Sequence, residues 1–374
     1  MHASKRKKIL LFIDSLVGGG AQRQIVTLAR CLHDSGYDVS VLTYRNEEQL
    51  RYLLDEKNIE HHVIEKKSKL DLLFIFRLYR YFKVIDPDCV ISYLNTPNLW
   101  GRLAGRMAGL KKIITSERNL DIDKSRVRIV IEKLIFRLSS CIVVNANAIK
   151  SLLIEKGIPA DKIQVIYNGL DLQYFKPVPL SEAEHFRASY GVLKADRLFL
   201  LPGRIMAQKN HLSLIRAVLT RVDVFKSAKL MFVGNEFDKK IKKDLVGLLA
   251  GTEIEGRVIF AGPQTKMPLV YSAADFVVLP SLWEGLPNVV IEAMACFKPV
   301  VVTDVADNAY IVRDSVDGFV VPAADDGKLA DVLERCMAME DKDISSMSQS
   351  ARNRAEELFG TDKFLASYER LINS

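Results

Sequence analysis

The sequence contains few cysteines and no long hydrophobic run. Its five cysteines stand at positions 31, 89, 141, 296 and 336, and no Cys-x-x-Cys pair occurs. An odd, scattered set argues against a disulfide framework, so we expect reduced cysteines, as in a cytoplasmic protein. A helix that crosses a bilayer needs roughly 20 apolar residues, whereas the apolar run 9–13 meets Asp14 after five residues.

The chain begins with a basic and then apolar stretch, "MHASKRKKILLFID". This arrangement superficially resembles a secretion signal, but its apolar part is too short and lacks a small-residue cleavage site. We therefore interpret residues 8–14 as the first strand of the fold.

Acidic residues are scarce in the first half of the chain. Residues 1–170 contain 28 Lys and Arg against 18 Asp and Glu, a net charge of +10, whereas the rest contains 25 against 28, a net charge of −3. The basic half favours a phosphate-rich partner: an anionic membrane surface, a phospholipid-like substrate or nucleic acid. Nucleic acid is the least favoured of these, because no run of stacking aromatic side chains accompanies the charge.

Short β-branched segments recur in two series, with helical patterns between them. The predicted strands are 8–14, 39–44, 89–94, 112–117, 141–146 and 163–169, then 198–203, 230–235, 258–262, 276–281, 299–304 and 318–322. One predicted helix, over residues 22–33, places Ile25, Leu28, Ala29 and Leu32 on a single face. Apolar strands that alternate with helices are typical of a parallel sheet covered on both faces.

Since 374 residues exceed one ordinary core, we predict an α/β fold with two Rossmann-like domains facing each other across a cleft. The domains are predicted to span residues 1–170 and 171–374. The junction lies in 170–196, where two prolines stand close together, and the chain from about 326 onward is predicted to be helical. The C-terminal helix could pack back on the first domain. Ligands of such sheets bind at the carboxyl ends of the strands.

Three glycines, Gly18, Gly19 and Gly20, stand between the first strand and the first helix. Glycines there let backbone N–H groups approach a phosphate at the helix N-terminus. The dinucleotide fingerprint fails, because Arg23 occupies the third glycine position, and the Gly-Lys-Ser/Thr ending of a P-loop is missing. The turn is therefore either a phosphate loop or a purely structural turn.

Two cations follow the first strand of the second series, in "LPGRIMAQKN" at 201–210. Arg204, with its forked geometry, and Lys209, as a point charge, could together neutralise a diphosphate. The alternative is a pair of solvated surface cations.

Two acids, Glu284 and Glu292, flank a Gly-x-Pro in "SLWEGLPNVVIEAMA" at 281–295. Pro287 suits the first turn of a helix, so Glu284 is expected in a loop and Glu292 about one turn inside the helix. Carboxylates accept hydrogen bonds from the vicinal hydroxyls of a hexose or a ribose. Gly285 leaves room for a ligand against the backbone. The alternative is a loop acid and an exposed helix acid with no joint function.

Taken together, several segments are similar to those of glycosyltransferase family 4. They are "GGGAQRQ", "YNGLDLQYF", "PGRIMAQKN", "LPSLWEGLPNVVIEAMACFKPVV" and "DGFVVP". The resemblance implies the GT-B fold and transfer of a sugar from a nucleotide diphosphate sugar with retention. The stretch "VISYLNTPNLWGRLAGRMAGLKKIITSERNLD" resembles members that add sugars to lipid-linked oligosaccharides in polysaccharide or O-antigen synthesis.

The resemblance also implies a role for each of the four charged residues above. Arg204 and Lys209 would hold the donor diphosphate and stabilise the leaving group as its charge develops. Glu284 would contact the donor sugar, and Glu292 would bind the ribose hydroxyls. No metal ion is then needed, and we predict neither a metal nor a cofactor.

Smaller residues complete the implied donor site. Gly285 and the backbone near Asn288 and Val289 would lie at the sugar and the phosphates. Gly19 and Gly20 would approach the diphosphate from the first domain.

One departure from the family pattern concerns a histidine that many relatives carry near the end of the fourth predicted strand. Here that region reads "TSERN", and none of the six histidines lies in it. Glu117, Arg118 or Asn119 could contact the acceptor or the sugar instead. We assign this catalytic role to Arg118.

Other polar patterns are weaker. The metal-type triplets at 86–88, 121–123 and 341–343 are too short to indicate a site, and His61 and His62 are expected at the surface or a sheet edge.

The stretch 66–85 has a broad apolar face bordered by basic residues. It includes Leu70, Leu73, Phe74, Arg77, Tyr81 and Ile85 near helical spacing. It is either an interfacial membrane helix or a helix packed on the first sheet with its cations turned outward.

The sequence thus predicts a retaining hexosyltransferase for cell-surface polysaccharide such as lipopolysaccharide O-antigen. Its donor would be a UDP-sugar or, less favoured, a GDP-sugar, and its acceptor a lipid-linked saccharide held by the basic domain. It would be cytoplasmic, bound peripherally to the anionic inner face of the cell membrane. A catalytically silent nucleotide-sugar-binding subunit and a GT-B nucleotide-sugar epimerase remain the alternatives.

Overall fold

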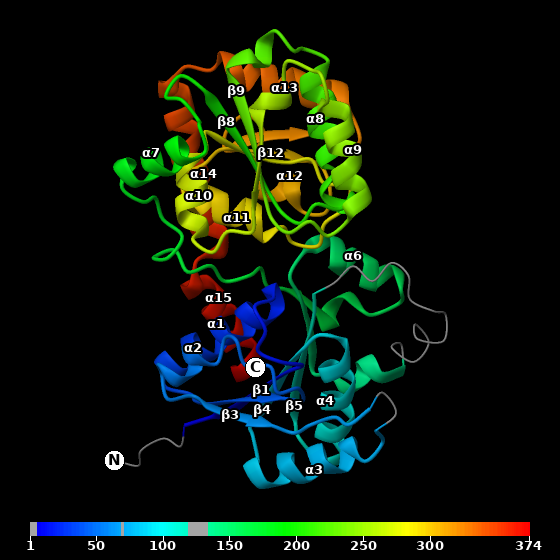
Figure 1. Cartoon of the computed structure of the whole chain (residues 1–374). Helices are drawn as coiled ribbons and strands as arrows, with labels where there is room; N and C mark the ends of the chain where they lie inside the picture. Colours follow the sequence, from blue (N-terminus) through cyan, green and yellow to red (C-terminus); the bar gives the residue numbers. More distant parts are fainter. Residues whose placement is uncertain (1–5, 69–70, 119–133) are drawn as a thin grey trace. The chain divides into compact units, whose positions relative to one another are not determined.

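The computed structural model describes residues 6–68, 71–118 and 134–374 (Figure 1). Leu70, Asn119 and the triplet 121–123 lie outside these described residues. The chain forms two compact units: unit 1 comprises residues 1–169 and 361–374, and unit 2 comprises residues 170–360. Within the described residues, no helix combines the length and the apolar character needed to span a membrane.

Unit 1 is built on a parallel sheet of seven strands in the order β3-β2-β1-β4-β5-β6-β7. The strands are β1 Lys8–Ile13, β2 Asp38–Thr43, β3 Glu60–Val63, β4 Cys89–Tyr93, β5 Lys112–Glu117, β6 Cys141–Val144 and β7 Ile163–Val165. Its α-helices are α1 Gly20–Asp34, α2 Tyr52–Asp55, α3 Phe74–Ile85, α4 Asn95–Met107, α6 Asn147–Glu155 and α15 Thr361–Asn373, with short 3-10 turns at Phe136–Leu138 and Ala160–Lys162.

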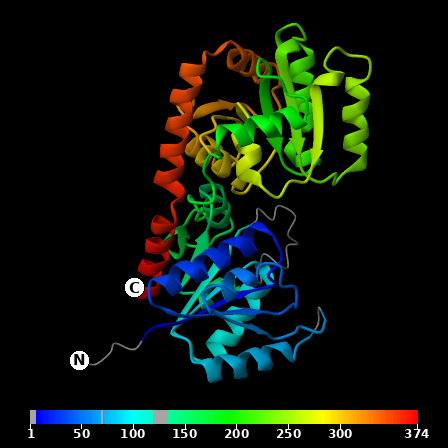
Figure 2. The same cartoon turned by 60° about the vertical axis from the view of Figure 1, so that its left-hand side comes forward.

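The sheet of unit 1 is covered on both faces. Helices α1 and α15 pack together on one face, although they stand at opposite ends of the chain (Figure 2). Helices α3 and α4 cover the other face. The helix predicted over 22–33 is confirmed: all four of its predicted core residues are buried.

Unit 2 is built on a parallel sheet of six strands in the order β10-β9-β8-β11-β12-β13. The strands are β8 Arg197–Pro202, β9 Ala228–Val233, β10 Val258–Gly262, β11 Phe276–Leu279, β12 Val300–Thr303 and β13 Gly318–Val321. Its α-helices are α7 Leu180–Ser189, α8 His211–Leu219, α9 Lys239–Leu249, α10 Met267–Ala273, α11 Asn288–Ala295, α12 Asn308–Ile311, α13 Asp326–Ala338 and α14 Asp341–Phe359, with short 3-10 turns at Ala207–Lys209, Val224–Ser227 and Glu255–Arg257.

Because the described strands of each sheet pair in parallel, their carboxyl ends share one edge of that sheet. In unit 2 the loops that follow β8 and β11 therefore meet at one edge. These two loops carry Arg204, Lys209 and Glu284, and Glu292 lies on the helix that follows the second loop. The two-sheet α/β fold is as predicted from the alternation of strands and helices.

One strand of the structure was not predicted from the sequence. Strand β3 has the sequence EHHV and pairs only with β2, at the edge of the sheet. Its alternation is too polar to resemble a buried parallel strand. The edge position expected of His61 and His62 is confirmed, but His61 is not a surface residue. Its side chain is buried against Thr43, and burial lowers its pKa.

The stretch 66–85 contains a shorter helix than its pattern indicates. Helix α3 begins at Phe74, and its buried face is Phe74, Leu78 and Phe82 at i, i+4 spacing. The predicted face is wrong at Leu73, which is 67% exposed. Because the helix starts after Leu73, that side chain lies outside the stripe that contacts the sheet.

The five cysteines, all of them described residues, are not joined in disulfides. Burial raises the pKa of the Cys89 and Cys296 thiols to about 12, so neither is a reactive thiolate near neutral pH.

Candidate functional site

The carboxyl edge of the unit 2 sheet brings together Lys209 and Glu284, which are 75 residues apart in sequence. Lys209 ends the 3-10 turn after β8, and Glu284 lies in the loop after β11. The Lys209 Nζ lies 2.6 Å from the Glu284 Oε1, and both side chains are largely buried. A buried pair of this kind requires further hydrogen bonds to offset its desolvation.

Those further hydrogen bonds come from the same two loops. The Ser281 hydroxyl donates to Glu284 Oε1 over 2.6 Å, and the Gln208 amide donates to Glu284 Oε2 over 3.3 Å. The Leu282 N–H donates to the Gln208 carbonyl over 2.9 Å, which ties the loop backbones together. The carboxylate is therefore held in one orientation.

Arg204 is the contrasting member of the edge. It is exposed, and within the described residues it has no hydrogen bond or ion pair. Its guanidinium lies over the Phe237 ring, 5.0 Å from the centroid. A stacked guanidinium keeps its N–H donors available for an anion such as a phosphate.

Two glycines allow the loops after β8 and β9 to touch through their backbones. Gly203 and Gly234 have φ of 151° and 152°, which L side chains rarely adopt. A Cβ added to Gly234 would lie 2.1 Å from the Gly203 carbonyl oxygen. The turn that presents Arg204 and Lys209 is therefore fixed by backbone contact.

Glu292 lies on α11, and a buried tyrosine fixes its position. The hydroxyl of Tyr271, from α10, donates to Glu292 Oε2 over 2.8 Å. Burial and the Glu292 charge raise the pKa of Tyr271, so it remains a neutral donor. Helix α11 begins at Asn288 after Pro287, as the sequence indicated.

The remaining donor-site residues of unit 2 lie around the start of α11. Gly285 follows Glu284 in the loop, and Asn288 and Val289 form the first turn of the helix, where N–H groups have no partner within the helix. All three are partly exposed. Their roles toward sugar and phosphate stay predictions.

The glycine turn of unit 1 opens helix α1. Gly19 is the N-cap and Gly20 is the first residue of the helix. The Gly18 N–H donates to the Gln49 side chain over 3.0 Å, and a Cβ on Gly19 would lie 2.2 Å from the Gln22 Oε1. The turn is thus packed locally, and its approach to a diphosphate stays a prediction.

Arg118 stands directly after β5 in unit 1 and is almost completely buried. Its guanidinium lies 4.7 Å from the centroid of the Tyr93 ring and donates to the Ser116 hydroxyl over 3.3 Å. It also donates to the Asn168 Oδ1. Glu117, the other described candidate, is the last residue of β5 and pairs with Arg102 at 3.3 Å.

A buried histidine at the same edge of unit 2 was not foreseen from the sequence. His211 begins helix α8, two residues after Lys209, and packs edge-on against Phe232. Neither ring nitrogen has a hydrogen-bond partner within the described residues. Burial, with a smaller effect of the Lys209 charge, lowers its pKa to about 4.

Sequence reasoning also missed Gln208, Ser281 and Tyr271, which hold the two acids. Gln208 and Ser281 lie within three residues of a predicted site residue, so proximity could have indicated them. Tyr271 lies in an apolar helix, so its pattern predicts a core residue. Its hydroxyl partner is 21 residues away, and no local spacing indicates that contact.

Metal binding has no structural candidate in the described part of the chain, where no three His, Cys, Asp or Glu side chains cluster. Of the described triplets, 86–88 precedes β4 and 341–343 begins α14. Asp88 instead accepts a hydrogen bond from the Lys8 N–H over 2.8 Å.

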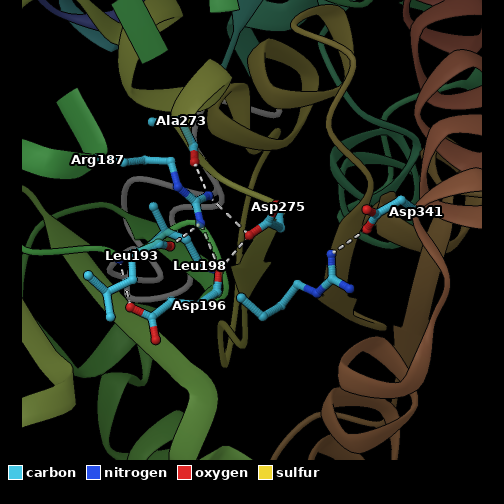
Figure 3. Close-up of polar contacts among 8 residues, drawn as sticks. Arg187, Leu193, Asp196, Leu198, Ala273, Asp275 and Asp341 are labelled. Atoms are coloured by element: carbon cyan, nitrogen blue, oxygen red, sulfur yellow. Dashed lines mark hydrogen bonds and ion pairs between the residues drawn. The ribbon is translucent and has the colours of Figure 1, made fainter. Parts of the chain in front are cut away.

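A second polar cluster of unit 2 lies at the opposite, amino end of the strands (Figure 3). Arg187 donates to the carbonyls of Ala273, Leu193 and Asp196 over 2.9, 3.3 and 2.6 Å. It also donates to the Asp275 carboxylate over 3.2 Å. Both terminal nitrogens of this arginine therefore hold the loops that precede β8 and β11.

The carboxylates of this cluster are engaged as well. Asp275 accepts the Leu198 N–H over 2.6 Å, and Asp196 accepts the Leu193 N–H over 2.8 Å. Arg197 pairs with Asp341 at 3.3 Å. These contacts fix the backbone where strands begin, which is a structural role.

Two family models match most of the chain. The model described as Glycosyltransferase Family 4 matches residues 18–174, and the model described as Glycosyl transferases group 1 matches residues 196–339. The chain belongs to the family 4 glycosyltransferases. It is therefore an enzyme of the glycosyltransferase class, as its motifs indicated.

Curated relatives of this glycosyltransferase align over most of their length. It is 26% identical to the Escherichia coli UDP-Gal:alpha-D-GlcNAc-diphosphoundecaprenol alpha-1,3-galactosyltransferase, over 76% of this chain and 74% of the relative. It is 24% identical to the Campylobacter jejuni N-acetylgalactosamine-N,N'-diacetylbacillosaminyl-diphospho-undecaprenol 4-alpha-N-acetylgalactosaminyltransferase, over 94% and 95%. Both names describe transferases, which does not favour a silent subunit or an epimerase.

The fold of this glycosyltransferase also matches a solved structure. The crystal structure of Anabaena Alr3699/HepE in complex with UDP superposes with a TM-score of 0.87 at 21% identity, covering 98% of this chain and 99% of that one. The two parallel-sheet units are those of the GT-B fold.

Proposed function

We propose that this glycosyltransferase moves a hexose from a UDP-sugar, with retention at the anomeric carbon, to a saccharide carried on a lipid diphosphate. The observation that carries the proposal is the arrangement of four charged residues at the carboxyl edge of the unit 2 sheet. Arg204 and Lys209 lie in the loop after β8, Glu284 in the loop after β11, and Glu292 on the helix that follows. The names of the two curated relatives support the acceptor class, since both act on diphosphoundecaprenol-linked saccharides. The UDP complex of the solved structure supports the nucleotide.

The Lys209–Glu284 ion pair gives this site a way to couple binding to chemistry. In the structure the Lys209 and Glu284 charges neutralise each other at 2.6 Å. When a diphosphate arrives, Lys209 turns to it together with Arg204, and the sugar hydroxyls replace Lys209 on the carboxylate. The cations then face the oxygen on which leaving-group charge develops, where electrostatic stabilisation contributes most to the rate.

Glu292 supplies the nucleotide side of the same site. Its carboxylate accepts the ribose hydroxyls, with its position held by the 2.8 Å bond from Tyr271. The phosphates lie between the two acids, near the first turn of α11, whose N–H groups favour an anion.

Unit 1 supplies the acceptor side. Its net positive charge favours a lipid diphosphate, and Arg118 is the residue we assign to the reacting groups. A guanidinium has five N–H donors, and its side-chain acceptors Ser116 and Asn168 leave others for a ligand.

Helix α3 is the proposed membrane contact. Its inner face packs on the sheet, while Phe76 and Val84 are exposed on its outer side and Leu72 and Leu73 are exposed just before it. Arg80 is exposed on the same side. An outer face of apolar and basic residues suits the anionic inner surface of the cell membrane, where polysaccharide precursors such as those of O-antigen are extended.

Nucleotide binding is the first test. Thermal unfolding of the wild type is measured with UDP, GDP and their hexose conjugates. UDP at 100 times its Kd should raise the Tm by roughly 5–10 °C, and GDP by less. Glu292→Gln should lose this shift, whereas Arg197→Met, at the amino end of the sheet, should keep it. If no nucleotide stabilises the wild type, the proposal is wrong.

Transfer is the second test. The donors that bind are incubated with N-acetylglucosaminyl diphosphate on a short synthetic lipid, and the anomeric configuration of the product is read by NMR. We expect an α-linked product from an α-linked donor, and a loss of roughly 100-fold with Glu284→Gln. An inverted product, or equal turnover in the variant, would contradict the assigned mechanism.

Vesicle binding tests the membrane contact. Flotation with vesicles of phosphatidylglycerol and phosphatidylcholine is compared with pure phosphatidylcholine. Phe76→Ser should release the protein from the anionic vesicles, and Leu193→Ser, an exposed leucine of unit 2, should not. Equal binding by the two variants would exclude α3 as the anchor.

A further inference from the structure

The last helix of the chain, α15, belongs to unit 1 rather than to unit 2, from which it emerges. Its residues Phe364, Tyr368 and Ile372 are buried against the sheet of unit 1. Two of them are apolar, but Tyr368 carries a hydroxyl into a fully buried position. A buried hydroxyl requires a partner, and the identity of that partner is informative.

The partner of Tyr368 is Tyr93, the last residue of β4. The two hydroxyl oxygens are 2.7 Å apart, and the Tyr368 hydroxyl also interacts with the Ser116 side chain near the end of β5. Burial raises the pKa of both phenols, so both remain neutral hydroxyls near neutral pH. A side chain from the C-terminus thus links the ends of two central strands.

Those same two residues hold Arg118. Its guanidinium stacks over the Tyr93 ring at 4.7 Å and donates to the Ser116 hydroxyl over 3.3 Å. Tyr368 therefore touches both supports of Arg118. Its own described hydrogen bond goes to Tyr93, and Ser116 is its other polar neighbour.

A second route leads from α15 to Arg118. The remaining described side-chain partner of Arg118 is Asn168, and the next residue, Gly169, lies under the Phe364 ring. A Cβ on Gly169 would be 2.7 Å from that ring. The Gly169 backbone is bonded on both its N–H and its carbonyl by Gln24, at 2.9 and 2.8 Å. The segment that carries Asn168 is therefore clamped between α1 and α15.

We propose that α15 is part of the acceptor side of the enzyme, with Tyr368 as a positioning residue that holds Arg118 through Tyr93 and Ser116. The inference rests on the proposed function, in which Arg118 serves the reacting groups. Its physical basis is satisfaction of buried polar groups. With Tyr368 in place the Tyr93 and Ser116 hydroxyls are fixed, and without it they reorient and loosen the guanidinium.

The first measurement needs no acceptor. The hydrogen-exchange rate of the Arg118 Nε–H is followed by NMR with ¹⁵N-labelled arginine, the signal being assigned by its loss in Arg118→Lys. Tyr368→Phe should speed exchange about tenfold, since one buried hydrogen bond is lost. Tyr37→Phe is the matched control: it removes a phenol hydroxyl that bonds Asn373 at the end of α15, outside this network. Unchanged exchange in Tyr368→Phe overturns the proposal.

The second measurement is a double-mutant cycle in the transfer assay. Tyr368→Phe should lower kcat about tenfold with an unchanged donor KM and an unchanged Tm shift by UDP. In the Arg118→Met background the same substitution should cost less than twofold, because its effect runs through Arg118. A further tenfold loss in that background would show that Tyr368 acts independently and would overturn the proposal.

The outcomes separate the two claims. If Arg118→Met leaves transfer unchanged, the assignment of Arg118 in the proposed function is wrong, and α15 cannot belong to the acceptor side through this residue. If Arg118→Met abolishes transfer while Tyr368→Phe changes neither exchange nor kcat, the proposed function stands and the positioning role is wrong.

Discussion

The two ends of the unit 2 sheet carry similar polar residues that differ in how many hydrogen-bond partners they have. At the amino end, Arg187 has four acceptors and Asp275 is bonded to both a backbone N–H and this arginine (Figure 3). At the carboxyl end, Arg204 has no hydrogen bond within the described residues. The two ring nitrogens of His211 have none there either.

Under the proposed function, the difference separates structural charge from functional charge. Native proteins pair nearly all their buried polar groups, so a cluster that is internally complete has little to offer a ligand. Polar groups left unpaired reduce stability and persist where binding uses them. Lys298 is an exception to this contrast, because it is a cation at the amino end whose charged form is disfavoured. Burial lowers its pKa, although the Asp275 charge opposes the effect.

The largest expected effect is on activity at the carboxyl end. Arg204→Met should lower transfer roughly 100- to 1,000-fold, because a donor to the leaving group is lost. Its Tm should change by less than about 2 °C, because the side chain is exposed and stacks only on Phe237. Steady-state kinetics and thermal unfolding check the pair of outcomes, with Arg204→Lys as the partial rescue. A large fall in Tm would show that Arg204 is structural after all.

The reverse pattern is expected at the amino end. Arg187→Met should lower the free energy of unfolding by about 3 kcal/mol, since it leaves a partly buried carboxylate and three carbonyls without their donor. The kcat of the folded enzyme should stay within twofold. Urea unfolding and kinetics at 25 °C measure both.

The control for this prediction is Arg197→Met in the same cluster. Its partner Asp341 is 95% exposed, so the loss should be below about 1 kcal/mol. Equal destabilisation by the two variants would contradict the distinction between a largely buried ion pair and one with an exposed partner.

The smallest expected effect at neutral pH concerns His211. An unfolded histidine binds a proton below about pH 6.5, whereas folded His211 does so only below about pH 4. The unfolded state therefore binds more protons in this window, and stability falls as the pH drops from 6.5 to 4, by up to roughly 3 kcal/mol. His211→Leu should flatten this part of the curve of unfolding free energy against pH. An unchanged slope in the variant would exclude His211 as its source.

Much of the fold was predictable from local sequence. Twelve apolar segments gave twelve of the strands, because a parallel sheet buries both faces and its strands are continuously apolar. Strand β3 was missed, since an edge strand with the sequence EHHV has no such signature. The start of α3 was also misplaced, because periodicity alone does not locate where a helix begins.

The sequence by itself determined the family, the two parallel sheets and the charged residues after β8 and β11, because these depend on composition and short spacings. Only the tertiary structure decided the partners of those residues. That Glu284 bonds Lys209, that Tyr271 fixes Glu292 and that Tyr368 reaches Tyr93 depends on contacts across 75, 21 and 275 residues. No local pattern encodes such pairs, since sheet order and helix packing determine which side chains meet.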